Sequence, residues 1–253
     1  MSAPLRRIGI PAIVLLVAAA CSPAGSAPGS VGASPSVAPS PTPARSPSVT
    51  GPGGPDPDAG AALDAFRAFI QTDPPFHMRA DMLLTVGPLT LDMDVVADVS
   101  GGNEKGTIDV RGSGTSVHMD IVVLDGTSYG RIAQRDWIVL PADTTSSNPL
   151  VGLDVAGLEP VGVVNAGGQL AHHLRTEDVS ALDTGTITGT AITALDIDSV
   201  AFDIYVTDAG VPLTAVMEFA GTGTVEGASQ AIEATVRYDF SKFGEPVEIE
   251  PPI

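Results

Sequence analysis

Regular alternation of apolar and polar residues over two consecutive stretches is the feature that most limits how this chain can fold. In Phe76–Val86, apolar residues stand at every second position, and most of the residues between them are polar. After a Gly87-Pro88 turn, the same pattern returns over Leu89–Val99, where aspartates fill most of the alternate positions. Because successive side chains of a β-strand point to opposite faces, the pattern predicts two antiparallel strands with one buried and one solvated face.

The same period continues through Val117–Leu140. Its first residues alternate again, Asp125-Gly126 provides the residues of a tight hairpin turn, and Trp137 opens a following strand. Further strands are predicted at Thr107–Arg111, Leu170–Val179, Val200–Val206, Val211–Phe219 and Ile232–Phe240, with a weaker neighbour near Thr186–Leu195. We therefore expect about ten strands in a single β-rich domain.

Two segments interrupt the alternation. Ala61–Thr72 has apolar residues at helical spacing and is stopped by Asp73-Pro74-Pro75, so we expect an amphipathic helix there. The apolar face of this helix consists of Leu63, Phe66, Phe69 and Ile70. The second segment, Asp143–Ala166, has short apolar groups cut by glycine and proline, which indicates short helical turns or a flap.

The N-terminal region has the layout of an export signal followed by a tether. Residues 1–20 contain a basic start, a short apolar run and small residues, and the sole cysteine, Cys21, follows directly. This favours a bacterial lipoprotein signal in which Cys21 is acylated and anchors the protein to the outer face of the cell membrane. An ordinary secretory signal with an incidental cysteine is the alternative. Residues 21–58 are rich in Pro, Ser and Gly and predict a disordered stalk, which leaves residues 59–253 as the folded domain.

The charge balance excludes some partners. The chain has 30 acidic residues against 12 lysines and arginines, a formal net charge of −18. Such an acidic surface argues against nucleic acid and against anionic membrane surfaces as partners of the domain face. Because Cys21 is the only cysteine, no disulfide can stabilise the domain.

Three patterns resemble catalytic or metal sites, and each has a simpler explanation. Gly126-Thr127-Ser128-Tyr129-Gly130 matches the motif of a hydrolase nucleophile elbow, but the sequence after it continues as a strand and not as a helix. His172 and His173 are adjacent on a predicted strand, so they point to opposite faces and do not chelate one ion together. We expect one of them to be buried and hydrogen-bonded and the other exposed.

Carboxylates also share strand faces, in two groups: Asp92, Asp94 and Asp98, and Asp196 and Asp198. No loop with calcium-ligand spacing accompanies them, so a solvated acidic face is the better interpretation. We therefore predict no catalytic residue, no metal, no cofactor and no enzymatic activity.

Several motifs of the chain resemble those of the LppX/LprG-type bacterial lipoproteins and, more distantly, the LolA/LolB lipoprotein carriers. They are the lipobox-like Cys21, the hairpin D-G-T-S-Y-G-R-I followed by R-D-W, N-P-L-V-G-L-D-V-A-G-L, L-A-H-H-L-R, and the ending Y-D-F-S-K-F-G-E-P-V-E-I-E-P-P. The resemblance implies a mainly β (α+β) fold, a half-open antiparallel β-barrel whose concave face is covered by the N-terminal helix and short helices or a flap. It also implies an apolar cavity that holds acyl chains.

A lipid or lipoglycan acyl chain is therefore the expected ligand, and opening of the Leu150–Val164 flap is the expected route of entry. The residues predicted to line the cavity are Phe66, Phe69, Met82, Met93, Met119, Leu150, Leu153, Leu158 and Met217. Methionine suits irregular apolar ligands, but it suits an ordinary core equally well. The alternative function is a tethered sensor or scaffold that binds an envelope protein and carries no lipid.

Overall fold

The computed structural model describes residues 50–54, 58–140, 149–150, 153, 155–166, 168–179, 193–225 and 227–252. The predicted signal segment, Cys21 and most of the predicted stalk lie outside these residues. The described elements are β1 (Thr50–Gly54), α2 (Ala59–Gln71), β2 (Phe76–Val86), β3 (Leu89–Ser100), β4 (Asn103–Gly112), β5 (Thr115–Leu124), β6 (Thr127–Ile132), β7 (Ile138–Val139), a 3₁₀ turn η1 (Val155–Gly157), β8 (Glu159–Ala166), β9 (Gln169–Thr176), β10 (Thr193–Val206), β11 (Pro212–Val225) and β12 (Ala228–Ser241).

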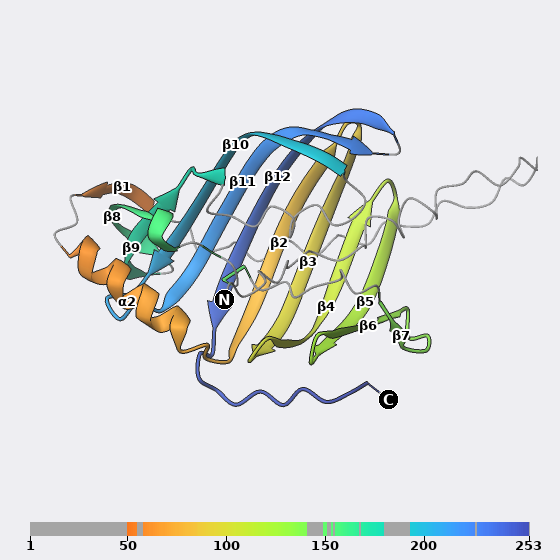
Figure 1. Ribbon diagram of the computed structural model, residues 1–253, viewed down its shortest axis with the longest axis horizontal. Coiled ribbons are helices and arrows are strands. Elements are labelled where there is room, and N and C mark those ends of the chain that lie inside the picture. The colour runs from red at the N-terminus through yellow and green to blue at the C-terminus, as the bar shows by residue number, and fades with distance from the viewer. Residues whose placement is uncertain are drawn as a thin grey trace, which may run out of the picture.

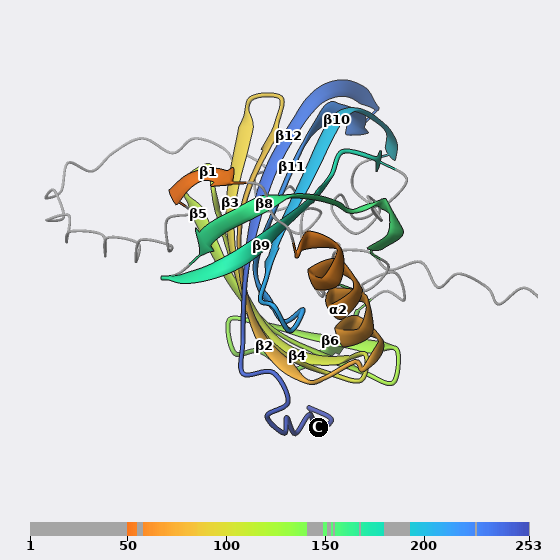
Figure 2. The same cartoon turned by 90° about the vertical axis from the view of Figure 1, so that its left-hand side faces the viewer.

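The described strands form one antiparallel sheet of 12 strands in the order β1-β8-β9-β10-β11-β12-β2-β3-β4-β5-β6-β7. The two ends of this order do not pair with each other, so the sheet curls without closing (Figures 1 and 2). Helix α2 lies on the concave side of the curl, beside β8 and β9 (Figure 2). The predicted half-open antiparallel barrel with an N-terminal helix is therefore confirmed.

The alternating stretches become the central strands with little change of bounds. Strand β2 pairs with β3 from Phe76 opposite Val99 to Val86 opposite Leu89, and the residues on one face of each strand are buried. Gly87 has a φ of 54°, and Asp125 and Gly126 have φ values of 50° and 78°. These are the left-handed conformations that tight hairpin turns require, which confirms both predicted turns.

The core fills the space between the concave face and α2. Phe66 is 0% exposed and packs with Ala62 and Leu63 into the same cluster as the inward residues of the strands. Phe69 and Ile70, near the end of the helix, remain partly exposed. The helix begins two residues before the predicted start and ends one residue before the predicted end, with its apolar face as expected.

The segment predicted as a flap is instead largely a strand. Only Val155–Gly157 forms a short helical turn, while β8 pairs with β9 from Glu159 to Ala166. Proline and glycine hid this strand in the sequence. Pro160 is tolerated because β8 is covered on its other side only at Val163–Asn165, where β1 pairs. The register also shifts between Pro160 and Gly162, which breaks the alternation.

Three further boundaries differ from the prediction. Strand β1, Thr50–Gly54, lies within the predicted stalk, so the sheet starts earlier than residue 59. The weaker strand expected near Thr186–Leu195 falls mostly outside the described residues, and its end, from Thr193, belongs to β10 itself. The strand after Trp137 comprises only Ile138–Val139.

Candidate functional site

A row of methionines crosses the middle of the concave face. Met217 lies opposite Val236 on the next strand, Val236 lies opposite Met82, and Met82 lies opposite Met93. All four side chains are buried, and Met119 lies on β5 opposite Ile108, in the same apolar cluster. The strand register therefore brings the four predicted methionines onto one apolar surface.

An apolar pocket lies where α2 ends and β2 begins. It has a volume of about 420 Å³, and we call it the mouth pocket. Its apolar side chains are Phe69, Ile70, Pro74, Phe76, Leu150, Leu153 and Phe243, and Asp73, Gly101 and Gly102 complete its wall. The lining residues come from the end of the helix, the β3–β4 turn, the segment before β8 and the residues after β12. Sequence-distant parts of the chain thus build one opening on the concave side.

Aromatic rings give the mouth pocket its shape. The Phe69 and Phe243 rings meet edge to face, with centroids 5.1 Å apart, and Phe243 also lies 5.4 Å from Phe76. Phe76 in turn contacts Phe240 at 5.9 Å. Aromatic pairs at these separations are favourable beyond the area that they bury, so these contacts stabilise one wall of the pocket.

Phe243 is positioned by the chain reversal that follows β12. Lys242 and Gly244 both have positive φ, 56° and 77°. The Gly244 N–H then donates a hydrogen bond of 2.8 Å to the Pro75 carbonyl at the start of β2. This bond fixes the residues after β12 beside the end of the helix and turns Phe243 into the pocket.

The predicted site residues fall into two groups. Phe69, Leu150 and Leu153 line the mouth pocket. The remaining residues, Phe66, Met82, Met93, Met119, Leu158 and Met217, are buried in the adjoining core cluster. Sequence reasoning missed Ile70, Phe76 and Phe243 as lining residues. Ile70 was detectable, because it shares the helix face with Phe69, whereas the position of Phe243 depends on the chain reversal.

A few polar side chains are buried with the apolar ones. Tyr238 is 4% exposed, and its burial raises the pKa of its hydroxyl. That hydroxyl makes no hydrogen bond with any residue in the described part of the chain. Thr214, by contrast, is buried and donates a 2.7 Å hydrogen bond to the Tyr238 carbonyl. A buried hydroxyl without a hydrogen-bond partner lowers the stability of the fold. Removal of the Tyr238 hydroxyl and removal of the Thr214 hydroxyl should therefore affect stability differently.

The geometry of Ser128 rules out a nucleophile elbow at this position. Ser128 is buried in the interior of β6, opposite Val123 of β5, and no helix follows that strand among the described residues. A nucleophile elbow requires its serine on a tight turn between a strand and a helix. Of the two glycines in the motif, Gly126 instead forms part of the β5–β6 turn and Gly130 lies within β6.

Every histidine of the chain is paired with an aspartate. His77 and His118 bond to Asp98 and Asp109, each at 2.8 Å, on the face of the sheet away from α2. His172 is buried, as expected of one of the pair, and bonds to Asp208 at 2.9 Å. His173 is partly buried and not exposed, because it bonds to Asp203 and stacks on Tyr205 at 4.8 Å.

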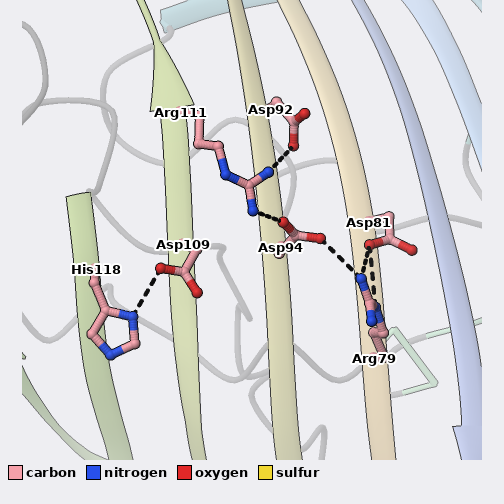
Figure 3. Close-up of polar contacts among 7 residues, drawn as sticks. All are labelled: Arg79, Asp81, Asp92, Asp94, Asp109, Arg111 and His118. Carbon is pink, nitrogen blue, oxygen red and sulfur yellow. Dashed lines mark hydrogen bonds and ion pairs between the residues drawn. The ribbon is translucent and has the colours of Figure 1, made fainter. Parts of the chain in front are cut away.

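The outer face of β2–β5 carries an ionic network. Asp81, Asp94, Asp109 and His118 lie in one transverse row of paired strand positions. Arg79 bridges Asp81 and Asp94, and Arg111 bridges Asp94 and Asp92 (Figure 3). The predicted solvated acidic face is therefore neutralised in part by arginines that reach across from neighbouring strands.

The two central carboxyl groups of this network differ in acidity. Hydrogen bonding to the Asp81 carboxyl and to the Arg111 guanidinium lowers the pKa of Asp94. Partial burial, followed by the hydrogen bond with Asp94, raises the pKa of Asp81. Asp94 is therefore the more acidic carboxyl group of the pair.

Within the described residues, no group of three or more His, Cys, Asp or Glu side chains is arranged to hold a metal ion. The same residues contain no helix that combines the length and the hydrophobicity needed to cross a membrane.

Comparisons with known proteins match at the level of overall structure. No family model and no curated protein sequence matches the chain. Among solved structures, the Mycobacterium tuberculosis lipoprotein LppX is similar at 14% identity over 76% of this chain and 99% of its own, with a TM-score of 0.46. A DUF1329 family protein from Desulfovibrio piger is similar at 14% identity over 78% of this chain and 96% of its own, with a TM-score of 0.29.

Proposed function

We propose that this protein is an envelope lipoprotein that binds the acyl chain of a lipid or lipoglycan in the mouth pocket at the end of α2. The mouth pocket is the observation that carries the proposal. Its volume of about 420 Å³ falls in the range of small-molecule pockets, roughly 300–1,000 Å³. Its walls are aromatic and aliphatic, and several of its lining side chains pack in or against the apolar cluster that contains the methionines.

Burial of methylene groups provides the binding free energy. Each buried methylene contributes about 0.8 kcal/mol, so roughly ten of them contribute about 8 kcal/mol before ordering costs. Few directional contacts are needed for such a ligand, and methionine side chains adapt to its shape. The pocket is therefore expected to select for the apolar character of an acyl chain more than for one particular acyl chain.

The segment ahead of β8 is the proposed gate. Leu150 and Leu153 form one wall of the mouth pocket, while residues from Glu159 onward are hydrogen-bonded into the sheet. The moving part is therefore shorter than the Leu150–Val164 flap expected from the sequence and ends before β8. Outward movement of Leu150 and Leu153 would widen the opening and leave the β8–β9 pairs from Glu159 onward intact.

Anchoring at Cys21 completes the proposal. Acylation of Cys21 would tether the domain to the outer face of the cell membrane through residues 22–49. The formal charge of −18 would keep the domain away from anionic lipid surfaces, so ligand exchange would take place at the end of the tether.

A second candidate function is binding of an envelope protein by the outer face of the sheet. It is favoured by a groove of about 550 Å³ across β9–β12 and β2. Leu83 lines this groove and is 51% exposed. Leu83 would be the apolar anchor of such a contact.

Native mass spectrometry of the full chain tests the proposal. A Cys21→Ser variant, purified without detergent from a lipid-containing host, is expected to carry one acyl lipid per chain, which organic extraction would then identify. Leu153→Glu places a charge in the mouth pocket and should abolish the bound mass. Leu170→Glu is the matched control, because Leu170 is 72% exposed and lies outside the pocket.

A Cys21→Ser mass that remains free of lipid after incubation with a host lipid extract would overturn the proposal. The second candidate function, binding of an envelope protein by the outer-face groove, would then be tested by crosslinking in cells. Far-ultraviolet circular dichroism of both leucine variants separates loss of binding from loss of folding.

A further inference from the structure

Both lysines of the chain line the same pocket. The sequence contains only two lysines, Lys105 on β4 and Lys242 directly after β12. They lie 137 positions apart, yet they flank one pocket of about 260 Å³ beside the C-terminal tail. The other lining residues are His77, Asp98, Glu245, Pro246, Val247 and Glu248. In a chain with a formal net charge of −18, the presence of both lysines at one pocket indicates that the pocket has a function.

The two lysines also differ from the arginines in how their charge is used. Most arginines of the domain form ion pairs, for example Arg79, Arg111 and Arg175 with neighbouring aspartates. Neither Lys105 nor Lys242 forms a hydrogen bond or an ion pair through its side chain with any part of the chain described by the structure. Their ammonium groups therefore remain available to an external anion.

The lysine pocket shares its supporting elements with the mouth pocket. At the start of β2, Phe76 lines the mouth pocket and the next residue, His77, lines the lysine pocket. After β12, Phe243 lines the mouth pocket and the adjacent residue, Lys242, lines the lysine pocket. Around the β3–β4 turn, Gly101 and Gly102 line the first pocket, while Asp98 and Lys105 line the second.

This shared rim follows from strand geometry. Consecutive residues of a strand point to opposite faces, so the strand ends place apolar side chains inside the barrel and polar ones outside it. A molecule with an acyl chain in the mouth pocket would leave the barrel at this rim. Its headgroup would then meet the outer side of the same three elements.

Resting on the function proposed above, we infer that Lys105 and Lys242 bind the anionic, phosphate-bearing headgroup of the lipid whose acyl chain occupies the mouth pocket. Ammonium groups bind phosphate oxygens through charge-assisted hydrogen bonds, which are stronger than neutral ones. The headgroup also lies on the side of the rim away from Asp73, the acidic residue in the wall of the mouth pocket. The substrate class is thus an anionic lipid and not a neutral one.

The carboxylates of the lysine pocket are compatible with this role. Asp98 is already engaged by His77 at 2.8 Å. Glu245 and Glu248 belong to the C-terminal tail, which runs below the strand ends (Figure 1). The Gly244 and Glu245 N–H groups hold the start of this tail, and within the described structure residues 246–252 make no hydrogen bond or ion pair. The tail can therefore shift when an anion enters.

Two ligands that differ only in the phosphate test the inference. Binding of lysophosphatidic acid and of the monoacylglycerol with the same acyl chain is measured by calorimetry, below micelle formation, on the delipidated Cys21→Ser full chain. The wild type should bind the phosphate lipid about tenfold more tightly, a preference of the size expected for two charge-assisted contacts at a solvent-exposed rim. Because such contacts are screened by salt, about 0.5 M NaCl should reduce the preference.

The matched variants are Lys105→Gln/Lys242→Gln and, as a control with the same change in net charge, Arg67→Gln/Arg135→Gln. The lysine variant should bind both lipids with the affinity of the monoacylglycerol for wild type, whereas the arginine variant should keep the preference. Glu248→Gln removes a competing carboxylate and should increase the preference. Glycerol phosphate alone should bind at least a hundredfold more weakly than the lipid, because it lacks the acyl chain whose burial provides most of the binding free energy.

Each contrary outcome has a distinct meaning. Equal affinity of the wild type for both lipids, or a preference that survives in the lysine variant, overturns the headgroup site and leaves acyl binding intact. Failure of the wild type to bind either lipid overturns the proposed function itself. Glycerol phosphate that binds as tightly as the lipid identifies the pocket as a site for free anions and overturns the lipid headgroup as its ligand.

Discussion

Replacement of Gly210 by alanine should loosen the helix from the sheet. Gly210 lies in the turn between β10 and β11 and has a φ of 74°. A Cβ atom at this position would lie 2.2 Å from the Ala65 carbonyl carbon and 2.3 Å from the Phe66 backbone nitrogen, both in α2. Backbone atoms of a helix cannot turn aside, so either the turn or the helix has to move.

Two terms contribute to the expected loss of stability. The left-handed backbone conformation costs an alanine about 1–2 kcal/mol. The contact with α2 adds a further cost, because relieving it displaces Phe66, which is 0% exposed in the core. Partial loss of one such side chain is worth about 1–3 kcal/mol. We therefore expect Gly210→Ala to lower the free energy of unfolding by about 2–5 kcal/mol.

Gly227→Ala is the matched control. Gly227 lies in the β11–β12 turn with a φ of 81°, and nothing lies within 4 Å of its Cβ position. This variant pays the conformational cost alone, about 1–2 kcal/mol. Urea denaturation of both variants measures the difference between them. Equal losses for Gly210→Ala and Gly227→Ala would refute the argument that the turn holds the helix in place.

Three further predictions follow from buried and paired groups. Tyr238→Phe should leave stability unchanged or raise it by up to about 1 kcal/mol, because the hydroxyl has no partner among the described residues. Thr214→Val should instead lower stability by about 1–2 kcal/mol through loss of its hydrogen bond. A large loss of stability in Tyr238→Phe, measured by urea denaturation, would contradict this. Phe66→Ala should cost about 3–5 kcal/mol in the same assay, and a loss below about 1 kcal/mol would show that α2 is not part of the core. Because the pKa of Asp94 is lowered below its ordinary value of 3.8, its ionised form stabilises the fold above that pH and loses this effect as the pH falls below it. Asp94→Asn should therefore be less stable than wild type by about 1 kcal/mol near neutral pH, and the two should converge in acid titrations of stability as the pH falls below 3.8 and through the lowered pKa. A difference that stays constant with pH would count against the assignment.

The fold was largely predictable because one physical signal, the period of two, repeats along much of the chain. Strands β2 and β3 were predictable almost to the residue, since Phe76–Val86 and Leu89–Ser100 each bury one face. Helix α2 was predictable from four apolar residues at helical spacing before a double proline. The signal failed in β8, where Pro160 and Gly162 interrupt the alternation at a shift in register.

The candidate site was predictable only in part. The methionines of the concave face follow from alternation, because residues on one face of a sheet are fixed by strand parity. The mouth pocket depends on long-range contacts that no local pattern encodes. Phe243 reaches the end of α2 only because the Gly244 N–H bonds to the Pro75 carbonyl. The convergence of Lys105 and Lys242 likewise depends on β12 pairing with β2, β2 with β3, and β3 with β4.

The position of a bound acyl chain tests the account most directly. A fatty acid with a photoactivatable diazirine near its methyl end, bound to the full-length Cys21→Ser protein and irradiated, would be located by peptide mass spectrometry. Adducts are expected on the residues that face the concave side, in the peptides that contain Phe69, Leu153 and Phe243. Adducts concentrated around Leu83 and Glu218 in the outer-face groove, at comparable yield, would contradict it.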